Sequence, residues 1–125
     1  MPYSAVFKDH LASPRNAGEI ENADAVAELT NPVCGDRLRL SLRVGGARRI
    51  EAARFLAYGC PPTLACGSAL AEMLEDMTLE DAARIERQDL ARALGGLPAR
   101  KSHAAALAVE TLREALALLN GARET

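Results

Sequence analysis

Apolar and polar residues alternate strictly along the segment Arg37–Val44. The alternation places one set on each face of an extended chain, Leu38, Leu40, Leu42 and Val44 against Arg37, Arg39, Ser41 and Arg43. A period of two predicts a β-strand with one buried and one solvated face. The following Gly45-Gly46 is a two-residue hairpin signal, so we expect Arg49–Tyr58 to return as an antiparallel partner. The apolar segment Ala25–Thr30 predicts a third, shorter strand.

Helical periods appear at both ends of the chain. Tyr3–Leu11 predicts a short helix capped by Ser4, with apolar residues at Tyr3, Val6, Phe7 and Leu11. The segment 14–24 is rich in turn-forming residues and is expected to be a loop. Ser102–Asn120 repeats apolar residues on one stripe and predicts a long last helix that ends at Gly121.

A third helical pattern fills the middle of the chain. Thr63–Met77 carries one apolar stripe, and Thr63 is a suitable N-cap residue. Shorter helices are expected to begin at Thr78 and to cover Asp89–Leu94, where Gly95-Gly96 closes the turn.

Together these elements predict an α+β fold, a small three-stranded antiparallel sheet with helices packed on one face. At 125 residues the chain is expected to form a single domain over 1–125, with no second module. Aromatic residues make up 3% and Trp is absent, so the core must be built mainly from Leu, Ala, Val and Ile.

Charge and cysteine content narrow the function. With 15 basic and 17 acidic residues the net charge is −2, which gives no indication of a nucleic-acid partner. No stretch approaches the roughly 18 apolar residues that a membrane span needs, so a cytoplasmic protein is expected. Three cysteines fit a metal or sulfur site in a reducing compartment better than a set of disulfides.

Two of the cysteines lie on predicted turns. Cys34 follows the first strand in Asn31-Pro32-Val33-Cys34-Gly35-Asp36, and Cys60 connects a strand to a helix in Tyr58-Gly59-Cys60-Pro61-Pro62. The N–H groups and dipole of a helix start beside Cys60 are expected to favour its thiolate. Soft ligands from separate turns are what zinc and iron sites require, and His103 offers an imidazole from a third turn.

These turns resemble motifs of the IscU/NifU N-terminal family of iron–sulfur scaffold proteins. Residues 31–36 are similar to its NPxCGD motif, and residues 58–60 to its second cysteine motif. The opening residues 3–18 and the segment 97–103 also resemble the family, whose counterpart of the latter ends in His-Cys. The resemblance runs over nearly the whole chain and implies the family's α+β fold.

The resemblance also implies a ligand set. In the family, three cysteines and a neighbouring Asp or His hold a transient cluster, which maps to Cys34, Asp36, Cys60 and His103 here. The family's third cysteine follows the histidine, whereas this chain has Ala104. Cys66 stands where the family usually has a small serine-like residue, and it is a further candidate ligand.

Each of these residues also has a structural explanation. Cys66 continues the apolar stripe of its predicted helix, and Cys34 and Cys60 could be surface thiols on turns. Asp36 could serve only to bond its own turn, and His103 could simply begin the last helix. The arginines at 37, 39 and 43 fit a solvated strand face, with a partner-docking surface as the alternative.

The leading hypothesis is therefore a non-enzymatic scaffold or carrier that receives iron and sulfur at these thiols. The resemblance implies a cysteine desulfurase as sulfur donor and suggests a chaperone, although the family's LPPVK chaperone motif is only partly kept in Leu97–Lys101. A homodimer is left open by the sequence. One alternative is a zinc- or iron-binding regulatory relative that lost scaffold activity when Ala104 replaced cysteine. Another is an interaction module that binds desulfurase or chaperone without metal.

Overall fold

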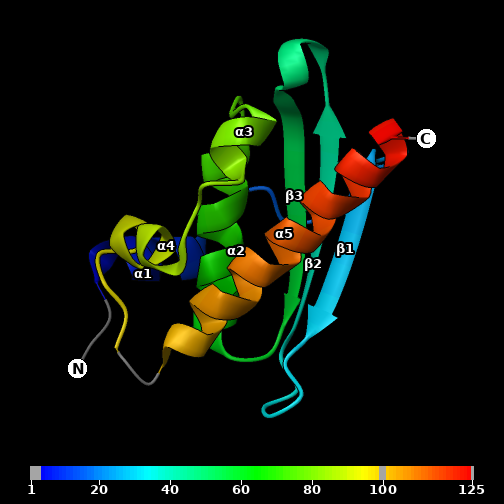
Figure 1. The fold of residues 1–125 in the computed structure, drawn as a ribbon. Helices are drawn as coiled ribbons and strands as arrows, with labels where there is room; N and C mark the ends of the chain where they lie inside the picture. Colours follow the sequence, from blue (N-terminus) through cyan, green and yellow to red (C-terminus); the bar gives the residue numbers. More distant parts are fainter. Residues whose placement is uncertain (1–3, 99–100, 125) are drawn as a thin grey trace.

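The computed structural model describes residues 4–98 and 101–124. Over this part of the chain three strands form one antiparallel sheet in the order β1-β2-β3 (Figure 1). The strands are β1 (Ala25–Thr30), β2 (Arg37–Val44) and β3 (Ile50–Tyr58). The three predicted strands and their antiparallel order are confirmed.

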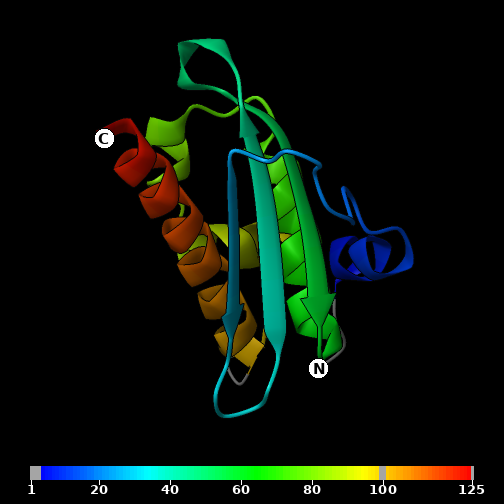
Figure 2. The same cartoon turned by 90° about the vertical axis from the view of Figure 1, so that its right-hand side faces the viewer.

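The helices of the described residues lie mainly on one side of this sheet. Their bounds are α1 (Ala5–Ala12), α2 (Pro61–Leu74), α3 (Leu79–Ala82), α4 (Arg87–Ala93) and α5 (Ser102–Glu124). Figures 1 and 2 show α2 and α5 running across one face of the sheet, with α1 beyond the β3 edge. The α+β class is therefore confirmed. None of these helices, within the described residues, combines the length and apolar character that crossing a membrane requires.

The core lies between the sheet and α2 and α5. Leu38, Leu40 and Leu42 of β2 are buried as the alternation predicted. Gly67 lets α2 approach the sheet closely, because a Cβ at this position would lie 2.6 Å from the ring of Phe55. Leu and Ala supply most of the buried side chains, as the low aromatic content required.

The opposite face of the sheet carries the arginines of β2. Arg39 is paired within the molecule, to Glu19 at 2.8 Å and to Glu28 at 3.4 Å. Arg37 lies 3.8 Å from Glu28. This pairing fits the solvated-face interpretation of the arginine stripe. The alternation predicts Ser41 on the same solvated face, but its short side chain is buried, with only 2% exposed.

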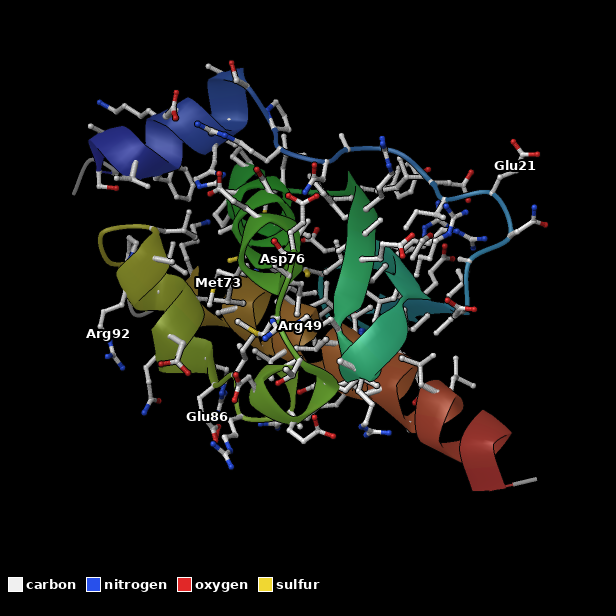
Figure 3. The ribbon with its side chains drawn as sticks, turned by 90° about the horizontal axis from the view of Figure 1, so that it is seen from above. Glu21, Arg49, Met73, Asp76, Glu86 and Arg92 are labelled. Carbon is white, nitrogen blue, oxygen red and sulfur yellow. The ribbon has the colours of Figure 1, made fainter. Side chains whose placement is uncertain are left out.

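The β2–β3 connection is longer than the predicted two-residue hairpin. Val44 pairs with Ile50, and the residues between them include the 3-10 turn η1 (Gly46–Arg48). Ile50 is held in place from outside the hairpin, because its N–H donates to the Met77 carbonyl at 2.8 Å. Figure 3, which views the molecule from above, shows Arg49 beside Asp76. The Arg49 guanidinium donates a hydrogen bond to the backbone carbonyl of Asp76.

Several helix boundaries also differ from the prediction: α2 ends at Leu74 and not at Met77, and α4 begins at Arg87 and not at Asp89. Helix α2 begins at Pro61 with Cys60 as its N-cap, so Thr63 is not the cap. Proline is well suited to a first helical position because its missing N–H would have no intrahelical partner there. Helix α5 continues past Gly121 to Glu124, since a glycine weakens a helix by only about 1 kcal/mol and does not by itself end it.

Helix α1 is anchored by a buried histidine that the apolar pattern missed. Ser4 caps the helix as predicted, but Val6 is 45% exposed while His10 is only 4% exposed. The His10 Nδ1 lies 2.6 Å from the Ser68 Oγ on α2. Burial and the nearby Arg15 lower the pKa of His10, against the raising effect of Glu72 and Asp9. Tyr3, also expected on this helix, lies outside the described residues.

Candidate metal and cluster site

The loop between β1 and β2 presents Cys34 to solvent. The Asn31 Oδ1 accepts the backbone N–H of Val33 at 2.9 Å and that of Cys34 at 3.4 Å. The Gly35 N–H donates to the Asn31 carbonyl at 2.8 Å, and Gly35 has a φ of 80°, where glycine is favoured. The Asx-type bonds of Asn31 thus fix the loop, and the Cys34 thiol remains exposed.

Cys60 caps the N-terminus of α2 and is half-buried. Its carbonyl accepts the N–H groups of Thr63 at 3.0 Å and Leu64 at 3.4 Å. The two positions between, Pro61 and Pro62, have no N–H. The first two helical positions therefore offer no unpaired N–H group to Cys60. This corrects the prediction that unpaired N–H groups at this helix start favour its thiolate.

The Asp36 carboxylate connects the two cysteine turns. It is only 6% exposed, and its Oδ2 accepts the Thr63 hydroxyl at 2.7 Å and the Cys60 thiol at 3.0 Å. Burial alone would raise the pKa of Asp36, but hydrogen bonds from the Cys60 thiol, Thr63, the Cys60 N–H and Cys34 outweigh it. The pKa of Asp36 is consequently held below its ordinary value, and the carboxylate is negatively charged at neutral pH.

Gly59 makes room for this carboxylate. A Cβ at Gly59 would lie 2.2 Å from the Asp36 Oδ1 and 3.0 Å from the Asp36 Cβ. The φ of Gly59 is 140°, a conformation that other residues rarely adopt. The glycine that the sequence pattern assigned to a turn therefore also forms one wall of the Asp36 pocket.

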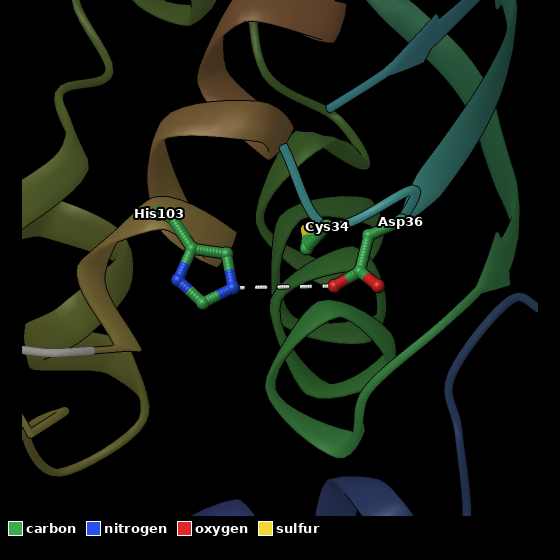
Figure 4. Close-up of side chains that lie close together, drawn as sticks. All are labelled: Cys34, Asp36 and His103. Carbon is green, nitrogen blue, oxygen red and sulfur yellow. Dashed lines mark ion pairs between the residues drawn. The ribbon is translucent and has the colours of Figure 1, made fainter. Parts of the chain in front are cut away.

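His103 completes the group from the first turn of α5. Its Nε2 lies 4.0 Å from the Asp36 Oδ2 (Figure 4). Ligand atoms of Cys34, Asp36 and His103 all lie within 4.8 Å of one another. Around a tetrahedral zinc, ligand atoms are roughly 3.3–3.8 Å apart, so small side-chain movements would bring these three to one ion.

The structure thus brings together four of the five predicted site residues. Cys34, Asp36, Cys60 and His103 converge from three separate segments, which confirms the predicted convergence; their role as ligands stays a prediction. Cys66 is placed differently, because its side chain is fully buried in the core. Burial and the neighbouring Cys60 raise the pKa of Cys66 to about 12, so its thiolate is strongly disfavoured. This environment argues for the core interpretation of Cys66.

Sequence reasoning gave Thr63 the wrong role and overlooked Asn31. The sequence predicts a helix cap at Thr63, yet its side chain is 1% exposed and donates to Asp36. One signal could have found it: the third helical position lies over the N-cap residue, so a hydroxyl there faces Cys60. For Asn31, the signal is an Asx residue two to three positions before the N–H groups that it accepts.

Comparison with known proteins places this geometry in a family. The sequence matches the NifU-like N terminal domain over residues 2–124. The chain belongs to this family. The match covers the segments that carry Cys34, Asp36, Cys60 and His103.

Several named relatives share the domain. The chain is 35% identical to the iron–sulfur cluster assembly scaffold protein IscU of Escherichia coli K12, covering 99% of this chain and 98% of that protein. It is 43% identical to the scaffold protein IscU 1 of Archaeoglobus fulgidus, covering 91% of this chain and 74% of that protein. It is 48% identical to the bifunctional protein NifU/MnmA of Rubrobacter xylanophilus, but spans only 22% of that longer protein.

A solved structure supports the fold. The N-terminal part of a NifU-like protein from Brucella abortus superimposes with a TM-score of 0.75, covering 94% of each chain at 14% identity. At that identity the likeness shows a shared fold. The NifU-like fold implied by the sequence motifs is thereby confirmed.

Proposed function

We propose that this NifU-like domain is a scaffold or carrier for iron–sulfur cluster assembly and that it turns over no substrate as an enzyme. The observation that carries the proposal is the convergence of Cys34, Asp36, Cys60 and His103 in a family whose relatives are named as such scaffolds. Iron, sulfur and the finished cluster would be cargo, held at this site and passed on.

The donor set suits that cargo. Two thiols and an imidazole are ligands that iron and zinc both accept, and the Asp36 carboxylate adds a harder oxygen donor. An exchangeable oxygen ligand is compatible with a cluster that is held transiently. The same donors would also hold zinc when the isolated protein meets it.

Sulfur delivery would use the exposed thiol. The Cys34 thiolate can attack the outer sulfur of a persulfide on a cysteine desulfurase, forming a new S–S bond while the desulfurase cysteine leaves as thiolate. Cys34 is the more accessible of the two site thiols, since Cys60 is half-buried. A desulfurase is thus the proposed sulfur-donating partner. A chaperone and self-association are further proposals; Ala99 and Arg100 of the chaperone-like segment lie outside the described residues.

The test is anaerobic reconstitution with ferrous iron, sulfide and a reductant, followed by absorption and Mössbauer spectra. The wild-type chain should show iron–sulfur charge-transfer bands, and Cys34→Ser and Cys60→Ser should lose them. A matched control is Cys66→Ser, which changes a core thiol outside the group. The proposal fails if the wild type forms no cluster.

A second candidate is a mononuclear zinc or iron protein without scaffold activity. The observation that favours it is Ala104, buried directly after His103 where the resemblance calls for a third cysteine. This candidate predicts one tightly bound metal ion per chain and no sulfide uptake under the same conditions. Restoring the pattern with Ala104→Cys should then confer cluster binding that the wild type lacks.

A further inference from the structure

Thr63 holds a place in the site that no ligand assignment gives it. Its hydroxyl donates to the Asp36 Oδ2 at 2.7 Å and lies 3.5 Å from the Cys60 Sγ. The side chain is 1% exposed and stands on the first turn of α2. A hydroxyl this close to one ligand and bonded to another acts on both without itself being a favoured donor to iron or zinc.

The acceptor capacity of Asp36 explains what the hydroxyl does. The Oδ2 has two donors, Thr63 and the Cys60 thiol. When Cys60 gives up its proton to bind a metal as thiolate, its hydrogen bond to Asp36 is lost. Thr63 is a donor that needs no deprotonation for metal binding, so its bond can persist in both states. Gly59 and the Cys60 N–H confine the carboxylate from the other side.

We infer that Thr63 is a positioning residue that holds the Asp36 carboxylate toward Cys34 and His103, and so determines how tightly the site binds metal. The inference rests on the proposed function, because it concerns the same ligands. Residues that hydrogen-bond a metal ligand fix its orientation, and losing one typically weakens metal affinity by about 10- to 100-fold. Thr63 is expected to act in this way on Asp36.

The test compares variants at Thr63 with zinc and cobalt as probes. Thr63→Val keeps the shape and removes the hydroxyl, Thr63→Ala removes it without adding a methyl group beside the carboxylate, and Thr63→Ser keeps it. Thr111→Val is the matched control, since it deletes another buried hydroxyl, one that donates to the Leu107 carbonyl at 2.7 Å. Zinc affinity is measured anaerobically by chelator competition, the Co(II) visible spectrum reports ligand geometry, and circular dichroism verifies folding.

Thr63→Val and Thr63→Ala should each bind zinc about 10- to 100-fold more weakly and shift the Co(II) bands, with Thr63→Ser close to wild type. Thr111→Val should lower only the melting temperature. A hydroxyl-free variant with wild-type affinity and spectrum would overturn the inference, as would Thr63→Ser binding as weakly as Thr63→Val. Wild-type protein that binds neither metal would overturn the proposed function, and this inference with it.

Discussion

Gly59→Ala is the substitution that the site should tolerate least. The new Cβ would meet the Asp36 carboxylate at 2.2 Å. Rotating Asp36 about its own χ1 moves the carboxylate but not the Asp36 Cβ, which would still lie 3.0 Å from the added methyl. Either the backbone at 59 or the loop carrying Asp36 must shift, and both bear site residues.

Gly59→Ala should lower the free energy of unfolding through two separate effects. A non-glycine residue at a φ of 140° costs about 1–3 kcal/mol. Weakening the charged hydrogen bonds of Asp36 adds about 1.5–3 kcal/mol. A total of about 2.5–6 kcal/mol should lower the melting temperature by roughly 10 °C or more in a domain of this size.

Alanine substitutions at two other glycines serve as controls that distinguish backbone strain from the steric clash. Gly96 has a φ of 104° with nothing within 4 Å of a built Cβ, so Gly96→Ala measures backbone strain without a clash. Gly46 has open space and no positive φ, so Gly46→Ala should be nearly silent. Urea and thermal unfolding of the three variants in metal-free buffer give the stabilities, and chelator competition gives zinc affinity. The reasoning is wrong if Gly59→Ala costs no more than Gly96→Ala and binds zinc like the wild type.

Three further outcomes are expected. Because the folded-state pKa of Asp36 lies below the ordinary 3.8, its carboxylate stabilises the fold above the unfolded-state pKa, and this stabilisation is lost as pH falls through the folded value. Urea unfolding measured from roughly pH 5 down to pH 2 should therefore show a steeper loss of stability for the wild type than for Asp36→Asn, and equal slopes would contradict the assignment. Cys66→Ala should cost about 1 kcal/mol and leave zinc affinity unchanged, since the thiol is a buried core group; loss of binding by chelator competition would make Cys66 a ligand after all. Excess zinc should raise the melting temperature of the wild type in a concentration-dependent way. At a free zinc concentration of 100 times Kd, the free energy of unfolding should increase by about 2.7 kcal/mol. An unchanged melting curve would favour the metal-free interaction module.

The fold was predictable wherever one period dominated. The leucines of β2 and the apolar stripe of α5 face the core as their periods predict, so local sequence and tertiary packing agree at these positions. Errors arose where tertiary contacts override local signals. The Gly45-Gly46 pair permits a tight hairpin, but the backbone hydrogen bonds of Ile50 to Asp76 and Met77, in the turn after α2, set where β3 begins.

The site was predictable from its motifs in part. Cys34, Cys60 and His103 are reactive or ligating residue types on turns, and the resemblance paired them before the structure brought them together. Position 66 showed the limit of such reasoning. A cysteine on an apolar helix stripe has the same sequence pattern whether its thiol faces a site or the core, and only the packing of α2 against the sheet distinguishes them.

The Asp36 carboxylate holds the two cysteine turns together in the metal-free protein. Without metal, its carboxylate collects donors from both cysteine turns and keeps Cys34 and Cys60 close together. A metal ion that displaced the thiol protons would take over that role, so under the proposed function the site is assembled before its cargo arrives. A preassembled site loses little conformational entropy on loading and unloading, which is what a carrier requires. Under the proposed function, the hydrogen bonds of Asp36 therefore keep the two cysteine turns together both before the cargo binds and after it leaves.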